Sequence, residues 1–336
     1  MPTILPSKVV PALPRAARHA GDDYGATAQP DWRSIDWPAH LHWAEVEGRA
    51  LNYLDIGPRD SEQLPTVFIH GLGGIWQNWL ENIPRAATDR RVIAMDLPGF
   101  GHSEMPREKH SISLMARVVE GLLDQVGLTS VAVVGNSMGG FVAAELAINY
   151  PQRVDRLVLA SAAGISSNDV RRRPASSIMK MGAILSANTV ASHRLVARRA
   201  HLRHVALSIV ARHPSRLKAD LAYEGLLQGV GTPGFADAVD ANLEYDFRDS
   251  LPEIGCPTLI IWGEKDPIIP VRDAKEYNEA IPDSRMVILE DTGHIPMAER
   301  PETFNELMMD FLDERGEADE NVSEAASAGD AETASA

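Results

Sequence analysis

The sequence has little of several features that define whole classes of protein. It holds a single cysteine, Cys256, in 336 residues, so an internal disulfide is excluded. No cysteine and histidine cluster has the spacing of metal ligands, and no G-x-x-x-x-G-K-S/T loop for phosphates occurs. The glycines from Gly71 to Gly74 do not complete a dinucleotide-binding G-x-G-x-x-G motif. The sequence therefore predicts no metal and no cofactor.

Long apolar runs are also missing. No stretch of about 18 or more apolar residues is present, which predicts that no segment spans a membrane. The first 30 residues hold scattered proline, arginine and aspartate and lack the continuous apolar region of a secretory signal. We therefore expect a cytoplasmic location.

A serine motif stands out against this background. Gly135-Asn136-Ser137-Met138-Gly139 follows the apolar run 131–134 and precedes the helix-like stretch 141–149. The G-x-S-x-G pattern presents a serine on a sharp strand-to-helix turn, where the residues two places away must be small. A hydroxyl becomes nucleophilic when a base takes its proton, and the resulting oxyanion needs backbone N–H donors. The pattern predicts Ser137 as a nucleophile and the Met138 N–H as a donor to the oxyanion.

The residues that would activate this serine follow it in the expected order of acid and then histidine. Asp266 comes four residues after the apolar run 258–262, and His294 comes shortly after the run 286–289. His294 is then the predicted general base, and Asp266 is the predicted acid that fixes its tautomer. Asp291 and Glu264 are the weaker candidates for the acid.

A glycine-rich turn upstream supplies the second predicted oxyanion donor. The apolar run 66–69 ends in His70-Gly71-Leu72-Gly73-Gly74. A turn of this composition can aim a backbone N–H at the oxyanion, and we assign that role to Leu72. His70 and His102 are interpreted as residues that stabilise turns, and Asp96 as one that braces the loop after its strand.

Taken together, the motifs resemble those of the α/β-hydrolase superfamily. The similarity covers residues 42 to about 312, and the motifs occur in family order. Besides the serine motif and the H-G-x-G turn, three further segments match: D-L-P-G-F-G-H-S at 96–103, W-G-E-K-D at 262–266 and D-T-G-H at 291–294. The resemblance implies an α/β-hydrolase fold, with a doubly wound, mostly parallel eight-stranded sheet, and a Ser-His-Asp triad. It leaves the substrate open, because one fold hosts many chemistries.

The chain divides by composition into four parts. Residues 39–165 and 249–314 are expected to form the core, 1–38 an extended N-terminal lead, and 315–336 a disordered acidic tail. Parallel strands are usually joined by one crossover helix, yet nearly a hundred residues separate Ala160 from Thr258. Because apolar residues between them follow helical spacing, residues 166–248 are predicted to form a helical cap over the active site.

The predicted cap has an unusual charge pattern. Residues 170–219 contain 11 Lys or Arg, four His and no acidic residue, while the whole chain has a formal net charge of −15. Three interpretations stay open: a solvated basic face that pairs with acidic residues of the core or of a partner subunit, a peripheral contact with anionic lipid, or an arginine that binds a substrate carboxylate. Nucleic acid is not expected, since the patch lacks interleaved aromatic residues and the chain is acidic. Homo-oligomerisation is left open.

The substrate is predicted only by class. The candidate substrate-binding residues are mostly apolar and lie near the serine, near the glycine turn or in the cap: Gly71, Gly73, Trp76, Phe141, Ile178, Met181 and Ile295. They favour a serine hydrolase that cleaves carboxylic esters of apolar acyl or ring-bearing substrates through an acyl-enzyme. The class includes esterases and lipases, with monoacylglycerols and lactones among the substrates.

Two other functions are kept as alternatives. The sequence G-N-S-M-G-G at 135–140 also resembles the elbow of meta-cleavage-product hydrolases, which break a carbon–carbon bond. Those enzymes usually have a proline in the oxyanion turn and an aromatic residue after the catalytic histidine, where this chain has Gly73-Gly74-Ile75 and Ile295. A non-catalytic ligand-binding protein is the third hypothesis, and the presence of all three triad residues argues against it.

Overall fold

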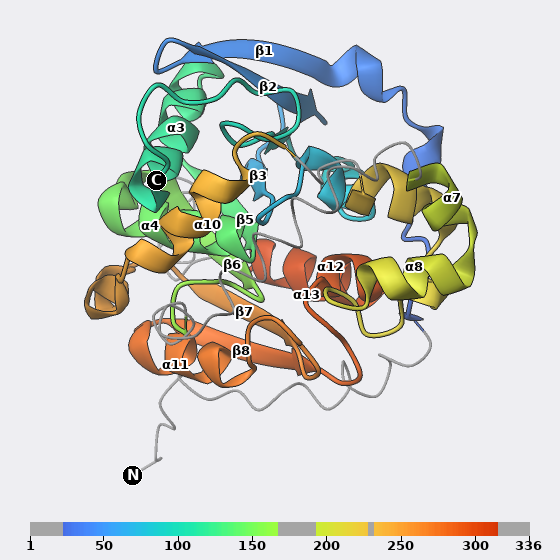
Figure 1. Ribbon diagram of the computed structural model, residues 1–336. Helices are drawn as coiled ribbons and strands as arrows, with labels where there is room; N and C mark the ends of the chain where they lie inside the picture. Colours follow the sequence, from blue (N-terminus) through green and yellow to red (C-terminus); the bar gives the residue numbers. More distant parts are fainter. Residues whose placement is uncertain (1–22, 167–192, 228–231, 315–336) are drawn as a thin grey trace, which may run out of the picture.

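One eight-stranded sheet organises the protein (Figure 1). The computed structural model describes residues 23–166, 193–227 and 232–314. The strand order is β1-β2-β4-β3-β5-β6-β7-β8. The strands are β1 (Leu41–Val46), β2 (Arg49–Ile56), β3 (Thr66–Ile69), β4 (Val92–Met95), β5 (Val131–Asn136), β6 (Val154–Ala160), β7 (Thr258–Gly263) and β8 (Ser284–Leu289).

The pairing confirms the predicted sheet. The first hairpin, β1 with β2, is antiparallel, and β2 pairs antiparallel with β4, while the remaining neighbours are parallel. Ile69 is aligned with Gly135, and Asn136 with Ala160, so β3, β5 and β6 end side by side. Because the carboxyl ends of parallel strands share one edge of the sheet, the loops that leave them meet there. The predicted serine, acid and histidine all follow strands at this edge.

Helices cover both faces of the sheet because its central strands are apolar on both sides. Within β3, Val67 and Ile69 belong to one buried cluster and Phe68 to the other. The first cluster is completed by α3 (Ile112–Gln125), α4 (Met138–Asn149) and α11 (Arg272–Ala280), and the second by α2 (Ile83–Ala86), α12 (Pro296–Glu299) and α13 (Pro301–Leu312). Figure 1 shows α3 and α4 together on one side of β5, with α12 and α13 on the other.

The N-terminal lead is packed where the structure describes it. Instead of running extended, residues 23–38 include the 3₁₀ helix η1 (Trp32–Ser34) and the start of η2 (Trp37–His40). Tyr24 and Trp32 are buried, and Trp32 Nε1 donates to Glu81 Oε1 at 3.0 Å. Residues 23–38 are therefore an ordered part of the lead, because Tyr24, Trp32 and Trp37 are large rings that gain from burial. Residues 1–22 and the predicted tail, 315–336, lie outside the described residues.

Between β6 and β7 the chain makes the long excursion predicted as a cap. We use the name cap segment for residues 166–248; its parts 193–227 and 232–248, with Ser166, are described. They hold α7 (His193–Arg198), α8 (Ala200–Leu207), η6 (Pro214–Arg216), α9 (Ala219–Leu221), the π-helical turn η7 (Ala222–Leu227) and α10 (Phe235–Glu244). The remaining 3₁₀ helices are η3 (Trp76–Trp79), η4 (Pro151–Arg153) and η8 (Arg248–Glu253). In the described residues, no helix has both the length and the apolar character needed to cross a bilayer.

Candidate active site

Ser137 occupies a strained turn between β5 and α4. Its backbone has φ 55° and ψ −121°, a conformation that non-glycine residues rarely adopt. Hydrogen bonds hold it there: Ser137 N donates to Ala160 O at 3.0 Å, and Ser137 O accepts from Ala163 N at 2.9 Å and from Phe141 N at 3.1 Å. Ser137 is partly exposed, although its neighbours Asn136 and Met138 are buried. The turn therefore presents the hydroxyl at the carboxyl edge of the sheet.

The glycines around the serine are required by close backbone approaches. A Cβ on Gly135 would lie 2.3 Å from Gly139 O, and a Cβ on Gly139 would lie 2.2 Å from Ile69 O. Real Cβ atoms do not come so close to backbone oxygen. The G-x-S-x-G spacing thus reflects tight packing of the β5–α4 turn against the end of β3.

A Gly139→Ala substitution is expected to destabilise the protein by ~3 kcal/mol, because the new methyl group would push α4 away from β3. Urea unfolding measures the change. Gly255→Ala is the matched control, since a Cβ there meets no atom within 4 Å, and we expect its effect to stay within ~0.5 kcal/mol. Equal stability of the two variants would contradict this account of the turn.

His294 and Asp266 lie in contact although they come from different loops. His294 Nδ1 is 2.8 Å from Asp266 Oδ2, and the two side chains are only 5% and 0% exposed. The other oxygen, Asp266 Oδ1, accepts from Ile268 N at 2.8 Å and from Ile269 N at 2.9 Å. An ionised carboxylate only accepts hydrogen bonds, so Nδ1 carries the imidazole proton and Nε2 is free to accept one.

The loop that carries His294 is tied to the serine turn through the backbone. Asn136 Nδ2 donates to Ala160 O at 3.0 Å and to His294 O at 3.2 Å. On the other side, Gly71 lies so near the serine that a Cβ there would be 3.0 Å from Ser137 Cβ. Within the described ranges, no hydrogen bond joins the Ser137 hydroxyl to the imidazole. The structure thus brings the serine, the histidine loop and the glycine turn together.

The two other candidate acids point elsewhere. Asp291 Oδ1 accepts from Arg212 Nε at 2.9 Å, and Asp291 Oδ2 lies 2.7 Å from His213 Nε2. Glu264 forms an ion pair with Lys265 at 3.1 Å. Their side chains are 49% and 41% exposed, in contrast to the buried carboxylate of Asp266. Of the three acids, only Asp266 contacts His294.

The glycine turn is held by His70, as the sequence suggested. His70 Nε2 accepts from Leu97 N at 3.0 Å, so Nδ1 carries the proton and donates to Gly71 O at 2.8 Å. Burial lowers the pKa of His70 to about 4, which keeps the ring neutral and preserves this bridge at ordinary pH. Asp96 braces the next loop, accepting from Trp76 N at 2.9 Å and from His102 N at 3.0 Å.

The predicted oxyanion donors, Leu72 and Met138, come from two parts of the chain: Met138 directly follows Ser137, and Leu72 follows Gly71, which lies beside the serine. Leu72 follows Gly71, and its turn is closed by the hydrogen bond from Gly74 N to Gly71 O at 3.0 Å. Met138 is the first residue of α4, and the first N–H groups of a helix have no intrahelical partner. Their role as oxyanion donors stays a prediction.

Several predicted substrate residues are held in the core. Trp76 is 3% exposed and lies 5.4 Å from the Trp37 ring. Phe141 has no exposed surface and packs against Phe247 and Tyr245 at 4.4 and 5.7 Å, and Ile295 is also buried. Gly71 and Gly73 belong to the turn beside the serine, whereas Ile178 and Met181 lie outside the described residues.

The cap segment reaches the glycine turn through a residue that the sequence did not single out. Phe235, at the start of α10, lies against Gly73, where a Cβ would be 3.0 Å from Phe235 Cε2. The preceding residue anchors the helix, because Gly234 N donates to Gly99 O at 2.9 Å. A proline-glycine pair at 233–234 signals a turn but does not indicate what the turn contacts.

Glu299 and Arg300 support the histidine loop and were also missed. Glu299 is fully buried and accepts from Gly293 N at 2.9 and 3.0 Å and from Ile295 N at 3.3 Å. Arg300 donates from Nε to Thr292 Oγ1 at 3.1 Å. Burial raises the pKa of Glu299 and lowers that of Arg300. Two adjacent charges within the otherwise apolar stretch 295–301 were the signal in the sequence.

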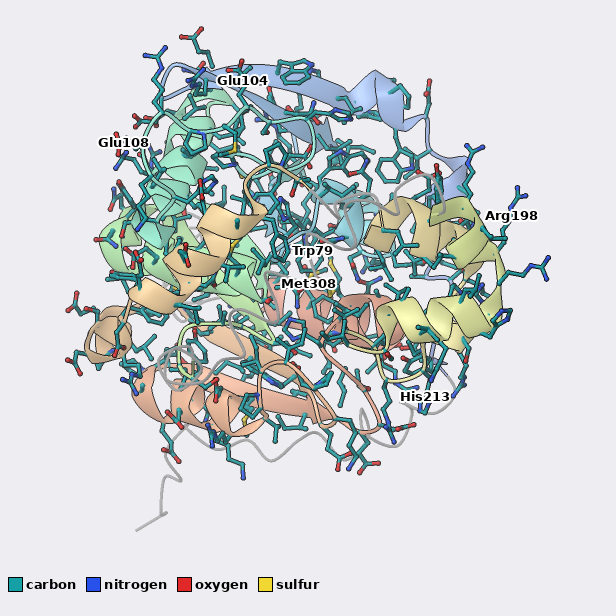
Figure 2. The ribbon with its side chains drawn as sticks, in the orientation of Figure 1. Trp79, Glu104, Glu108, Arg198, His213 and Met308 are labelled. Atoms are coloured by element: carbon teal, nitrogen blue, oxygen red, sulfur yellow. The ribbon has the colours of Figure 1, made fainter. Side chains whose placement is uncertain are left out.

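The outer surface of the cap segment combines basic and apolar residues. Leu195, Val205 and Ile209 are 54%, 75% and 61% exposed. Figure 2 shows Arg198 extending outward from the same region. This surface would be the place of contact if the hypothesis of lipid binding holds, and that hypothesis stays a prediction. Among the described residues, no group of His, Cys, Asp and Glu is arranged to hold a metal ion.

The chain belongs to the α/β hydrolase fold family, whose family model matches residues 65–301. The resemblance inferred from the motifs is thereby confirmed, together with the fold class. The curated proteins similar to this chain have more than one activity. Over 273 residues, it is 31% identical to the dihydrolipoyllysine-residue acetyltransferase component of the acetoin cleaving system of Pseudomonas putida, covering 80% of this chain and 68% of that one.

Two further similarities are to hydrolases. The chain is 29% identical over 282 residues to the 2-hydroxy-6-oxononadienedioate/2-hydroxy-6-oxononatrienedioate hydrolase of Escherichia coli, covering 80% of this chain and 93% of that one. Among solved structures, a bacterial membrane phospholipase A superposes with a TM-score of 0.65 at 27% identity, covering 84% of this chain and 89% of that chain.

Proposed function

We propose that the protein is a serine hydrolase that cleaves carboxylic esters of apolar acyl or ring-bearing substrates. The observation that carries the proposal is the 2.8 Å contact between His294 and Asp266, next to a serine in a strained turn. A partly exposed nucleophile, a base and a buried acid at one edge of the sheet are the groups that acyl transfer requires.

Each group has a defined role in the proposed reaction. The Ser137 hydroxyl attacks the ester carbonyl while His294 Nε2 takes its proton, and Asp266 stabilises the imidazolium that forms. The N–H groups of Leu72 and Met138 hold the oxyanion. His294 then returns the proton to the leaving alcohol, and water hydrolyses the acyl-enzyme by the same route. The hydroxyl and the imidazole approach when substrate binds, since such contacts are often long in free enzymes.

Carbon–carbon bond hydrolysis of a meta-cleavage-type ketoacid is the alternative, and the relative from Escherichia coli favours it. A ketoacid substrate would need a cation for its carboxylate. Two cap arginines already have partners: Arg203 Nη2 donates to Ser215 O at 3.1 Å, and Arg212 pairs with Asp291 at 2.9 Å. Neither of these two guanidinium groups is available without breaking an existing contact, so on this alternative the cation would come from another residue of the cap segment.

A substrate panel tests the proposal. We expect the purified protein to hydrolyse p-nitrophenyl esters, monoacylglycerols or lactones, and to be labelled at Ser137 by a fluorophosphonate. Both reactions should vanish in Ser137→Ala. Cleavage of a meta-cleavage dienoate far faster than of any ester would assign the protein to the carbon–carbon class. Absence of both turnover and labelling would leave a non-catalytic ligand-binding protein.

A further inference from the structure

Tyr24 links the N-terminal part of the chain to the histidine loop and to the cap segment. Its hydroxyl donates to Glu299 Oε2 at 2.5 Å and accepts from His213 N at 2.7 Å. Burial, reinforced by the neighbouring carboxylate of Glu299, raises the pKa of Tyr24 far above its ordinary value. The hydroxyl therefore keeps its proton and remains a donor.

Glu299 is the centre of this junction. Its carboxylate accepts from three parts of the chain: from Gly293 N and Ile295 N on either side of His294, from Arg212 N of the cap segment at 2.7 Å, and from the Tyr24 hydroxyl. All these partners are donors, and together they compensate for burying the carboxylate. Removing one donor leaves the others to rearrange around a buried acceptor.

The ring of Tyr24 also has contacts on several sides. The Arg300 guanidinium lies 4.7 Å from the ring centroid, and that of Arg216 lies 5.1 Å from it. The His213 ring packs edge-on at 5.2 Å. Next along the chain, Gly25 N donates to Glu299 O at 2.9 Å. Tyr24 therefore has one defined position, between the cap segment and the α12–α13 junction.

The part of the cap segment that Tyr24 contacts also holds the histidine loop directly. His294 N donates to Val210 O at 2.8 Å. A Cβ on Gly293 would lie 2.8 Å from Arg212 N, so the two backbones are in contact. Residues 210–213 thus form one wall of the loop that carries His294.

We propose that Tyr24 is a positioning residue for the reaction: by bridging Glu299 and His213 it holds residues 210–213 against the loop 290–295 and so fixes the direction of the His294 imidazole. The inference rests on the proposed function. It concerns a residue outside the segment 65–301 that matches the family, in a part of the chain with no catalytic motif. Tyr24 would act on the reaction through Glu299 and the loop, without touching the substrate.

The test is Tyr24→Phe in the full chain, which keeps the ring and removes only the bridging oxygen. We expect kcat to fall by between ~10-fold and the ~10²-fold that a small misplacement of a catalytic group can cost. KM should change by less than about twofold, because the contacts with substrate are untouched. The far-downfield proton resonance of His294 Nδ1–H, hydrogen-bonded to Asp266, should shift or broaden.

Asp23→Asn is the matched control. Asp23 precedes Tyr24, is buried, and caps α13 by accepting from Thr303 N at 2.9 Å and from Glu302 N at 3.2 Å. Its substitution should lower the Tm without changing kcat or the resonance. If both variants lose the same factor in kcat, Tyr24 serves stability alone and the proposal is overturned.

The outcomes also separate this inference from the proposed function. A wild-type protein that turns over no ester and resists the fluorophosphonate would refute the function, whatever the variants do. A wild-type protein that is active, combined with a Tyr24→Phe variant that keeps its kcat and its downfield resonance, would refute the positioning role alone.

Discussion

Replacement of Ser137 by alanine is expected to lower kcat by at least ~10³-fold while the fold stays intact. The substitution removes only the hydroxyl, and the Cβ that packs beside Gly71 remains. The backbone hydrogen bonds of Ser137 N and O also remain. Turnover of the best ester measures the loss, and circular dichroism checks the fold.

Ser161→Ala is the control for this experiment. Ser161 directly follows β6 beside the serine turn, has a positive φ of 45° and is fully buried. Its hydroxyl has no hydrogen-bond partner among the described residues, so removing it should leave kcat unchanged. A Ser137→Ala variant that retains half of the wild-type activity would refute the assignment of the nucleophile.

The second large effect is expected for Asp266→Asn, which should lower kcat by up to ~10⁴-fold. The two N–H groups of Ile268 and Ile269 that now donate to Asp266 Oδ1 would hold the amide oxygen of the variant at that position. The amide nitrogen would then face His294 Nδ1 as a donor. The imidazole would then carry its proton on Nε2 instead of Nδ1. A protonated Nε2 could no longer accept the proton of the serine hydroxyl.

Asp291→Asn is the matched comparison. Asp291 lies three residues before His294, but its side chain is half exposed and pairs with Arg212 and His213. Because exposed ion pairs contribute little, we expect kcat of the Asp291→Asn variant to stay within about threefold of wild type. Comparison of kcat for the two variants, on the same ester, decides between the acids. A larger loss for Asp291→Asn would exchange their roles.

The sequence predicted the parts of the site that are encoded locally. The serine turn is recognisable within five residues, because close backbone approaches, of Gly135 to Gly139 O and of Gly139 to Ile69 O, require glycine at both positions. Asp266 and His294 each follow a strand, and strand ends are recognisable from apolar runs. The alignment of those ends in a parallel sheet then brings the residues together without further information.

The supports of the site could not be predicted in the same way. Glu299 and Tyr24 are 275 positions apart, and no local pattern indicates that they meet. An apolar residue such as Phe141 could lie in a substrate pocket or in the core. Its packing against Phe247 shows that it lies in the core. The packing of residues 23–38 could not be predicted, because the overall composition of the lead gives no sign of where its three aromatic side chains pack.

The distance along the chain between Tyr24 and Glu299 also bears on the order in which the protein folds. A contact between residues 275 positions apart closes a long loop, and the entropic cost of closing it is repaid only once the intervening structure exists. During synthesis Tyr24 leaves the ribosome long before its partner is made. On the proposed role of Tyr24, full activity therefore requires this long-range contact as well as a formed sheet.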